Sequence, residues 1–296
     1  LRIQQATLVM NEVNSATVWS FPDADIAITR QEFGADVAID LPLTNEGREA
    51  RFQFQSEMIE SGELVAVLNF DNIHFANLAR SVNMEEPFKI ADLPLFGTIN
   101  VIIDNNDISL LSYDVSSGIG TLNIPYVYDE PLKIEALAAR GSYVPQQARF
   151  NLDSFFTSVN GGEVTSEGSV VLPIGGREAD AQFIIRVNQL QVKDLPRLWP
   201  ARFGRNGHTW VANNLESGLV REGRVNLDIR PEDMGVMPKP LRYFNAEFQF
   251  EDLKAHFLRP MPAITGARGN GYVNTQNLEI YLEGGAINQV DVGSSR

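Results

Sequence analysis

The sequence predicts an all-β protein with a long, curled, mainly antiparallel sheet and a few short helices. The first observation behind this prediction is strict period-two alternation, as in residues 35–41 and 51–55, which marks strands with one apolar and one polar face. The second is a series of hairpin-type turns between such segments. The third is the absence of a βαβ rhythm, because about sixteen strand candidates follow one another at the spacing of an all-β fold.

The clearest strands are separated by turns rich in Asn and Gly, which adopt the backbone conformations that tight hairpins need. These strands cover residues 24–28, 35–41, 51–55, 224–230, 246–250 and 278–283. The clearest turns are Asp104-Asn105-Asn106-Asp107, Asn160-Gly161-Gly162 and Gly284-Gly285. Together they predict a sheet that is built from consecutive hairpins.

Three strands end in the same pattern of six aligned positions, with apolar residues at five of them and an Asn, Gln or Asp directly before the third apolar residue. The copies are Leu68-x-Phe70-x-x-Ile73-x-Phe75-x-x-Leu78, Ile185-x-Val187-x-x-Leu190-x-Val192-x-x-Leu195 and Phe248-x-Phe250-x-x-Leu253-x-Ala255-x-x-Leu258. We predict that each copy is a strand running into a short helical turn. The copies would then mark uneven repeat units, 1–90, 91–200 and 201–296, of one continuous β segment over 1–296. Chance matching between alternating strands is the alternative explanation.

Residues 194–218 interrupt the strand pattern and predict two short helices. Pro196 and Pro200 bound the first, and Asn206 is a candidate cap for the second. Gly218 follows the expected end of the second helix, after which the strand pattern returns.

Composition excludes several classes of function. The chain has 38 acidic and 24 basic residues and a formal net charge of -14, which argues against binding nucleic acid. Cysteine is absent, so disulfides, thiolate metal sites and a cysteine nucleophile are excluded. No apolar run reaches the roughly 18 residues that span a bilayer. Because the chain opens at Leu1, without Met and inside a strand pattern, we expect a fragment of a longer polypeptide whose anchor lies outside it.

No arrangement of residues predicts catalysis, a metal ion or a cofactor. None of the three histidines, His74, His208 and His256, has a second histidine at metal-ligand spacing, and a local structural role is favoured for His74 and His256. Acidic pairs such as Glu251-Asp252 are typical of a solvated face. Gly-x-Ser-x-Gly is absent, and the glycine pairs precede strands, so neither a nucleophile elbow nor a phosphate loop is indicated.

One stretch resembles the AsmA-like envelope proteins, and within them the YhdP type. The similarity is clearest in Leu195-Pro196-x-x-Trp199-Pro200, then Trp210-Val211-x-x-Asn214-Leu215-x-x-Gly218-x-Val220, then Val225-Asn226-Leu227-Asp228-Ile229-Arg230-Pro231. Looser similarity covers Ile3-x-x-Ala6-Thr7-Leu8, Trp19-x-x-Pro22-Asp23-Ala24-Asp25 and Leu93-Pro94-Leu95-Phe96-Gly97.

The resemblance implies a β-sheet curled into a taco-like groove in the periplasm of a Gram-negative bacterium. The full-length protein would be anchored in the inner membrane by a segment outside this chain. It would take part in phospholipid transport towards the outer membrane, with other envelope proteins at the two ends of the full-length chain. No catalytic residues are implied.

The alternating apolar residues of the clearest strands are the candidates for binding lipid acyl chains. They are Val37, Ile39, Leu41, Phe52, Phe54, Val225, Leu227, Ile229, Phe248 and Phe250. The same residues would line an ordinary core, so two other hypotheses stay open. One is an envelope scaffold with a dry, closed interior and no transported ligand. The other is a carbohydrate-active enzyme on a β scaffold, which needs acidic residues converging with aromatic ones in a polar cleft.

Overall fold

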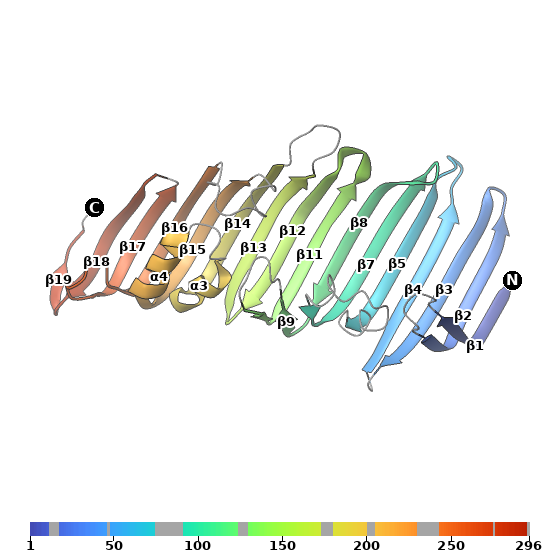
Figure 1. The fold of residues 1–296 in the computed structure, drawn as a ribbon, viewed down its shortest axis with the longest axis horizontal. Coiled ribbons are helices and arrows are strands. Elements are labelled where there is room, and N and C mark those ends of the chain that lie inside the picture. The colour runs from blue at the N-terminus through green and yellow to red at the C-terminus, as the bar shows by residue number, and fades with distance from the viewer. Residues whose placement is uncertain are drawn as a thin grey trace. The chain divides into compact units, whose positions relative to one another are not determined.

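The structure is a computed structural model that describes residues 1–11, 18–45, 48–74, 91–123, 130–172, 180–199, 205–229, 243–274 and 276–294. Over these ranges the chain is all-β, as predicted from the sequence. Its principal sheet has 16 described strands, it is antiparallel and open, and its strands follow chain order (Figure 1). The order is β1-β2-β3-β4-β5-β7-β8-β11-β12-β13-β14-β15-β16-β17-β18-β19.

Contacts divide the chain into two compact units, and the division into three repeat units stays a prediction. Unit 1 comprises residues 1–123 and 136–153. Its elements are β1 Arg2–Asn11, β2 Val18–Gln31, β3 Gly34–Asn45, β4 Arg48–Met58, β5 Leu64–His74, β6 Ala91–Asp92, β7 Pro94–Asp104, β8 Asp107–Ser117, β9 Gly120–Leu122, β11 Ala136–Val144, the 3₁₀ turn Pro145–Gln147 and the first part of β12 Arg149–Val159.

Unit 2 comprises residues 124–135 and 154–296. Its elements are β10 Leu132–Ile134, the rest of β12, β13 Gly162–Val171, β14 Asp180–Gln191, the 3₁₀ turn Val192–Asp194, α3 Leu195–Leu198, α4 Arg205–Asn214, β15 Leu215–Ile229, β16 Tyr243–Ala255, β17 Ile264–Asn274, β18 Leu278–Ile287 and β19 Val290–Val292. The two predicted helices between β14 and β15 are confirmed, and Figure 1 shows them against one face of the strands of this unit.

Two of the three predicted hairpin turns are confirmed. Asn105 and Asn106 join β7 to β8, both with φ in the left-handed region that two-residue hairpins require. Asn160 and Gly161 join β12 to β13 in the same way. The turn predicted at Gly284-Gly285 is wrong, because these residues lie inside β18, where they pair with neighbouring strands. The hairpin turn lies beyond them, at Asn288-Gln289.

The sequence repeat corresponds to a repeated irregularity in three strands. Asn72, Gln189 and Asp252 have φ values of 54, 53 and 52° and lie inside β5, β14 and β16. In β5 and β16 the pairing register with the following strand shifts by one at this point, as at a β-bulge. The apolar residue two positions earlier faces a glycine in each copy, in the pairs Phe70–Gly97, Val187–Gly223 and Phe250–Gly269.

The helical turn predicted after each repeat is found in one copy. Leu190 leads into the 3₁₀ turn and α3, as predicted. After Leu253 the prediction is wrong: β16 continues to Ala255 and a non-helical turn follows. Pro260 and Pro262 lie in that turn and lack the N–H groups that a helix would need. The turn predicted after Ile73 lies outside the described residues.

Candidate functional site

In unit 1 the five candidate residues gather on one face of the sheet. Ile39 pairs with Phe54, and Leu41 pairs with Phe52, across the β3–β4 ladder. Residues that stand directly opposite each other in an antiparallel pair point to the same side, and so do alternate residues along a strand. Val37 therefore joins this set, and all five side chains are only half-buried.

The same apolar face continues into strands whose residues were not predicted as site residues. Phe52 and Phe54 pair with Phe70 and Leu68 of β5, and Leu68 in turn pairs with Ile99 of β7. Sequence reasoning missed this extension because β5 begins Leu64-Val65-Ala66-Val67-Leu68, which is apolar at every position and hides the alternation. The pairing of neighbouring strands places further residues on the same face: Ile26, Ile28, Leu68, Phe70, Ile99, Val101, Leu111 and Tyr113.

Tyr113 shows that this surface is apolar enough to affect a polar group. It pairs with Ile99, and burial raises the pKa of its phenol above the ordinary value, with the charge of Asp153 as the second cause. Its hydroxyl donates a long hydrogen bond, 3.5 Å, to the backbone oxygen of Asn151.

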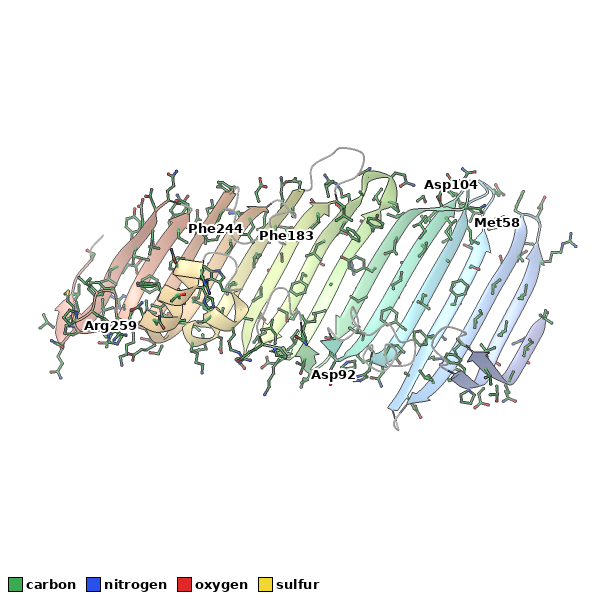
Figure 2. All side chains as sticks on the ribbon, viewed as in Figure 1. Met58, Asp92, Asp104, Phe183, Phe244 and Arg259 are labelled. Carbon is green, nitrogen blue, oxygen red and sulfur yellow. The ribbon has the colours of Figure 1, made fainter. Side chains whose placement is uncertain are left out.

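Unit 2 carries a second apolar face. Leu227 lies between Phe183 of β14 and Phe244 of β16 (Figure 2). Val225 pairs with Ile185 and Ala246 on the same side. Farther along β15, Gly223 pairs with Phe248 and Val220 pairs with Phe250, so both phenylalanines lie next to this face. Ile229 pairs with Ala181, but its side chain lies outside the description of the structure. The pairing of β15 with β14 and β16 also places Phe183, Ile185, Val187 and Phe244 on this face. The sequence-based prediction did not include these four residues.

The opposite face of each unit is mainly polar, although Val65, Ile102 and Leu110 also pair on it in unit 1, and its polar side chains are tied together across the strands. Arg51 Nε donates to Asp40 at 2.7 Å and holds the pKa of that carboxyl below its ordinary value. Thr98 Oγ1 donates to Asn69 at 2.7 Å on the same side. In unit 2, Arg186 donates to Glu167 at 2.8 Å. These pairs hold charged side chains on the polar side, and the apolar positions of residues 37–41, 52–56 and 64–70 carry no charged side chain.

The apolar face is covered only in part. In unit 2 a buried cluster of Leu190, Val192 and Val220 packs against Leu195 and Leu198 of α3. A second buried cluster, around Phe250, Ala255, Ile264 and Ala267, includes half-buried Phe248. Val225, Leu227, Phe183 and Phe244 remain half-buried. Among the described residues of unit 1, no α-helix lies on the face formed by β2 to β8.

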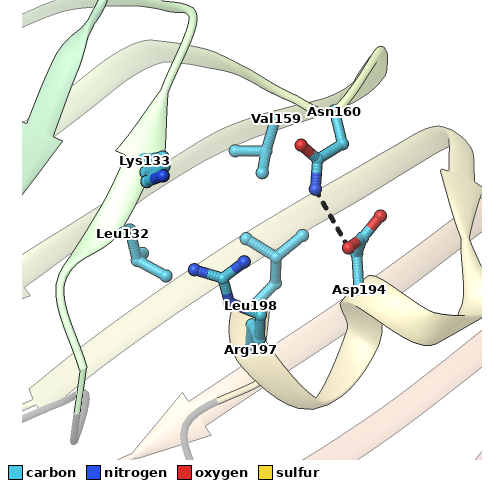
Figure 3. Close-up of a pocket in the computed structure, with 7 residues that line it drawn as sticks. All are labelled: Leu132, Lys133, Val159, Asn160, Asp194, Arg197 and Leu198. Carbon is cyan, nitrogen blue, oxygen red and sulfur yellow. Dashed lines mark hydrogen bonds between the residues drawn. The ribbon is translucent and has the colours of Figure 1, made fainter.

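A small pocket lies beside α3 in unit 2 (Figure 3). Its volume is ≈ 30 Å³, and it is lined by Leu132, Lys133, Val159, Asn160, Asp194, Arg197 and Leu198. Asn160 Nδ2 donates to Asp194 Oδ1 at 3.0 Å and ties the β12–β13 turn to the 3₁₀ turn. The pocket has room for one or two water molecules and not for an acyl chain.

The histidines form local contacts of a structural kind. His208 Nε2 lies 2.9 Å from the backbone oxygen of Pro196 and ties α4 to α3. Lys254 and His256 both contact the exposed Glu216, and hydrogen bonding from Lys254 and then from His256 holds the pKa of that carboxyl below its ordinary value. Within the described part of the chain no cluster of three or more His, Cys, Asp or Glu side chains is arranged to hold a metal ion. Nor does that part contain a helix long and apolar enough to cross a membrane.

Comparison with protein-family models, with curated proteins and with solved structures finds no match to this chain.

Proposed function

We propose that this chain holds lipid acyl chains on the apolar faces of its sheet. The observation that carries the proposal is a one-sided, half-buried apolar face that continues across neighbouring strands in each unit. Such a face is stabilised when it leaves water, and each methylene that it buries contributes about 0.8 kcal/mol. A flexible hydrocarbon ligand needs no fixed polar partners, which agrees with the mainly apolar character of the paired positions on this face, where Ser56, Tyr113 and Ser166 contribute hydroxyl groups.

The wider role that we propose is phospholipid transport between the inner and outer membranes of a Gram-negative bacterium. The similarity to AsmA-like proteins supports this setting, with the chain in the periplasm as one part of a longer, membrane-anchored protein. Headgroups would stay at the polar rim of the groove, and other envelope proteins would meet the ends of the full-length chain.

The alternative proposal is an envelope scaffold with a dry interior, and the two buried clusters of unit 2 favour it. Leu190, Val192 and Val220 are buried and pack against Leu195 and Leu198 of α3. A carbohydrate-active enzyme is less well supported. Glu251 forms an ion pair with Arg221, and Asp252 is an exposed bulge residue, so this acidic pair does not converge on a polar cleft.

Photo-crosslinking in cells tests the proposed function. A benzophenone amino acid placed at Phe52 or Leu227 is expected to capture phospholipid, because both positions lie at half-buried centres of an apolar face. Matched control positions are Gln55 and Gln249, which are exposed on the polar side of β4 and β16. Equal capture at all four positions, or capture at none of them, would contradict the proposal. Native protein free of copurifying lipid, together with no capture, would favour the scaffold.

A further inference from the structure

Four hairpin ends of unit 1 lie at the same edge of its sheet and combine exposed apolar side chains with acidic ones. They join β2 to β3, β4 to β5, β7 to β8, and β11 to β12, and Figure 2 shows Met58 and Asp104 at this edge. We call this surface the hairpin rim. Its apolar residues are between 36% and 47% exposed; they are Phe33, Met58, Ile59, Ile108 and Phe150.

Three contacts hold apolar residues of the rim in place, two of them between different hairpins and one within the β11–β12 hairpin. Met58 of β4 packs over Gly34 of the β2–β3 hairpin. A Cβ added to Gly34 would stand 3.2 Å from the sulfur of Met58. Phe150 stacks on Tyr143 with ring centroids 4.1 Å apart. Gln146 Nε2 reaches the backbone oxygen of Ile108 at 3.5 Å. The rim is therefore a row of neighbouring anchors and not a set of isolated exposed residues.

The charge of the rim is strongly negative. Residues 30–36, 57–63, 104–108 and 145–150 contain two arginines, Arg30 and Arg149, and seven carboxylates: Glu32, Asp36, Glu57, Glu60, Glu63, Asp104 and Asp107. On the polar face, by contrast, acidic residues such as Asp40 and Asp114 are each paired with an arginine. The rim thus presents apolar anchors inside an uncompensated negative field.

We infer that the hairpin rim binds a basic, amphipathic segment of another protein. Charge complementarity selects this occupant among those that an exposed apolar surface attracts. A second copy of the chain carries the same net charge of -14 and is repelled. An anionic membrane surface is repelled for the same reason. Lys and Arg side chains of a protein segment would meet the carboxylates, while its apolar residues pack on Phe33, Ile59 and their neighbours.

The spacing of the hairpins indicates the length of the segment. Successive hairpins at one edge are two strands apart, about 9.6 Å, so four of them extend over about 29 Å. A helix of about 20 residues covers that distance at about 1.5 Å per residue. A helix with apolar residues at i, i+3, i+4 and i+7 and lysines elsewhere would place one apolar row along the rim.

A binding assay with the full chain tests this inference. The probe is a 20-residue Leu/Lys peptide with helical periodicity, and its comparison peptide has Glu in place of every Lys. The chain should bind the lysine peptide only. Phe33→Ser/Ile59→Ser should weaken binding about tenfold, since apolar anchors carry much of the affinity of such interfaces. Glu60→Gln/Asp107→Asn should weaken it about threefold or more and reduce its salt dependence.

Matched variants elsewhere separate a specific surface from general charge attraction. Phe257→Ser/Leu258→Ser and Glu222→Gln/Glu283→Gln change equally exposed residues of unit 2 and should alter affinity less than about twofold. No binding of the lysine peptide, equal binding of the glutamate peptide, or equal losses in the unit 2 variants would overturn the inference. So would rim-dependent self-association or vesicle binding without peptide binding. Lipid crosslinking at Phe52 and Leu227 is independent of every one of these outcomes.

Discussion

Aromatic rings lie across glycines at several places in the sheet, and the ring fills the space that a side chain would take. A Cβ added to Gly271 would stand 2.3 Å from Phe248 Cζ, and one added to Gly168 would stand 2.5 Å from Phe183 Cδ1. Such cross-strand pairs stabilise a strand that glycine alone would weaken. They also place large apolar surfaces at the positions proposed to contact acyl chains.

Gly97 offers the sharpest prediction at this scale. Its φ is +155°, and an added Cβ would lie 2.3 Å from the backbone oxygen of Asp114. Gly97→Ala is therefore expected to lower the free energy of unfolding by about 2 kcal/mol or more, because backbone atoms must move. Urea unfolding monitored by circular dichroism measures the change. Gly118→Ala is the control, since its Cβ would meet only Pro94 at 3.6 Å, and a similar loss in both variants would contradict this explanation.

The repeated left-handed residue is the characteristic feature at the scale of single strands, and in β5 and β16 it coincides with a bulge-type shift of register. One left-handed residue re-aims the strand, so that the apolar residues before and after it reach the same buried region, as Val187 and Leu190 do in β14. A fourth example occurs in β1, where Gln5 has a φ of 52° and the register shifts between Ile3 and Ala6. The repeat thus preserves a backbone conformation and not only an apolar pattern.

Substitutions at Gln189 test the importance of that conformation. The residue is exposed, so its side chain contributes little packing. Gln189→Gly is expected to be neutral or stabilising by up to about 1 kcal/mol, because glycine adopts a left-handed backbone without strain. Gln189→Val should destabilise by about 1–2 kcal/mol, since a β-branched residue is strained there. Chemical unfolding measures the free energy of unfolding of both variants. Equal values for the two variants would show that the left-handed φ of residue 189 does not matter for stability.

At the scale of the whole molecule, the described strands form open surfaces whose polar sides are linked by local ion pairs and hydrogen bonds. A ligand that binds the folded state alone raises its apparent stability by mass action. The half-buried apolar faces of the two units are the surfaces through which such stabilisation would act.

Thermal unfolding with a short-chain phospholipid, below its micellar concentration, tests this expectation. Ligand at tenfold over Kd contributes about 1.4 kcal/mol, which corresponds to a rise in Tm of about 2–3 °C for a chain of this size. Phe54→Asp should abolish most of the rise, because it places a charge on the apolar face of β4. Gln55→Asp, on the polar side of the same strand, should keep it. An equal rise in both variants would argue against binding at this face.

The sequence by itself determined the fold class, the hairpin order and the side on which Val37, Phe52 and Leu227 lie, because the period of two belongs to each strand's own pleat. It also contained the repeat and predicted the helical turn after Leu190, but it did not reveal the left-handed residue in each copy, because alternation alone does not report φ. Only the tertiary structure decided that Leu68, Ile99 and Phe183 extend the faces, and that α3 covers the cluster around Leu190 while Leu227 stays half-buried. The pairing register of the strands and the packing of helices on the sheet depend on contacts between segments far apart in the chain. Local periodicity carries no information about such contacts.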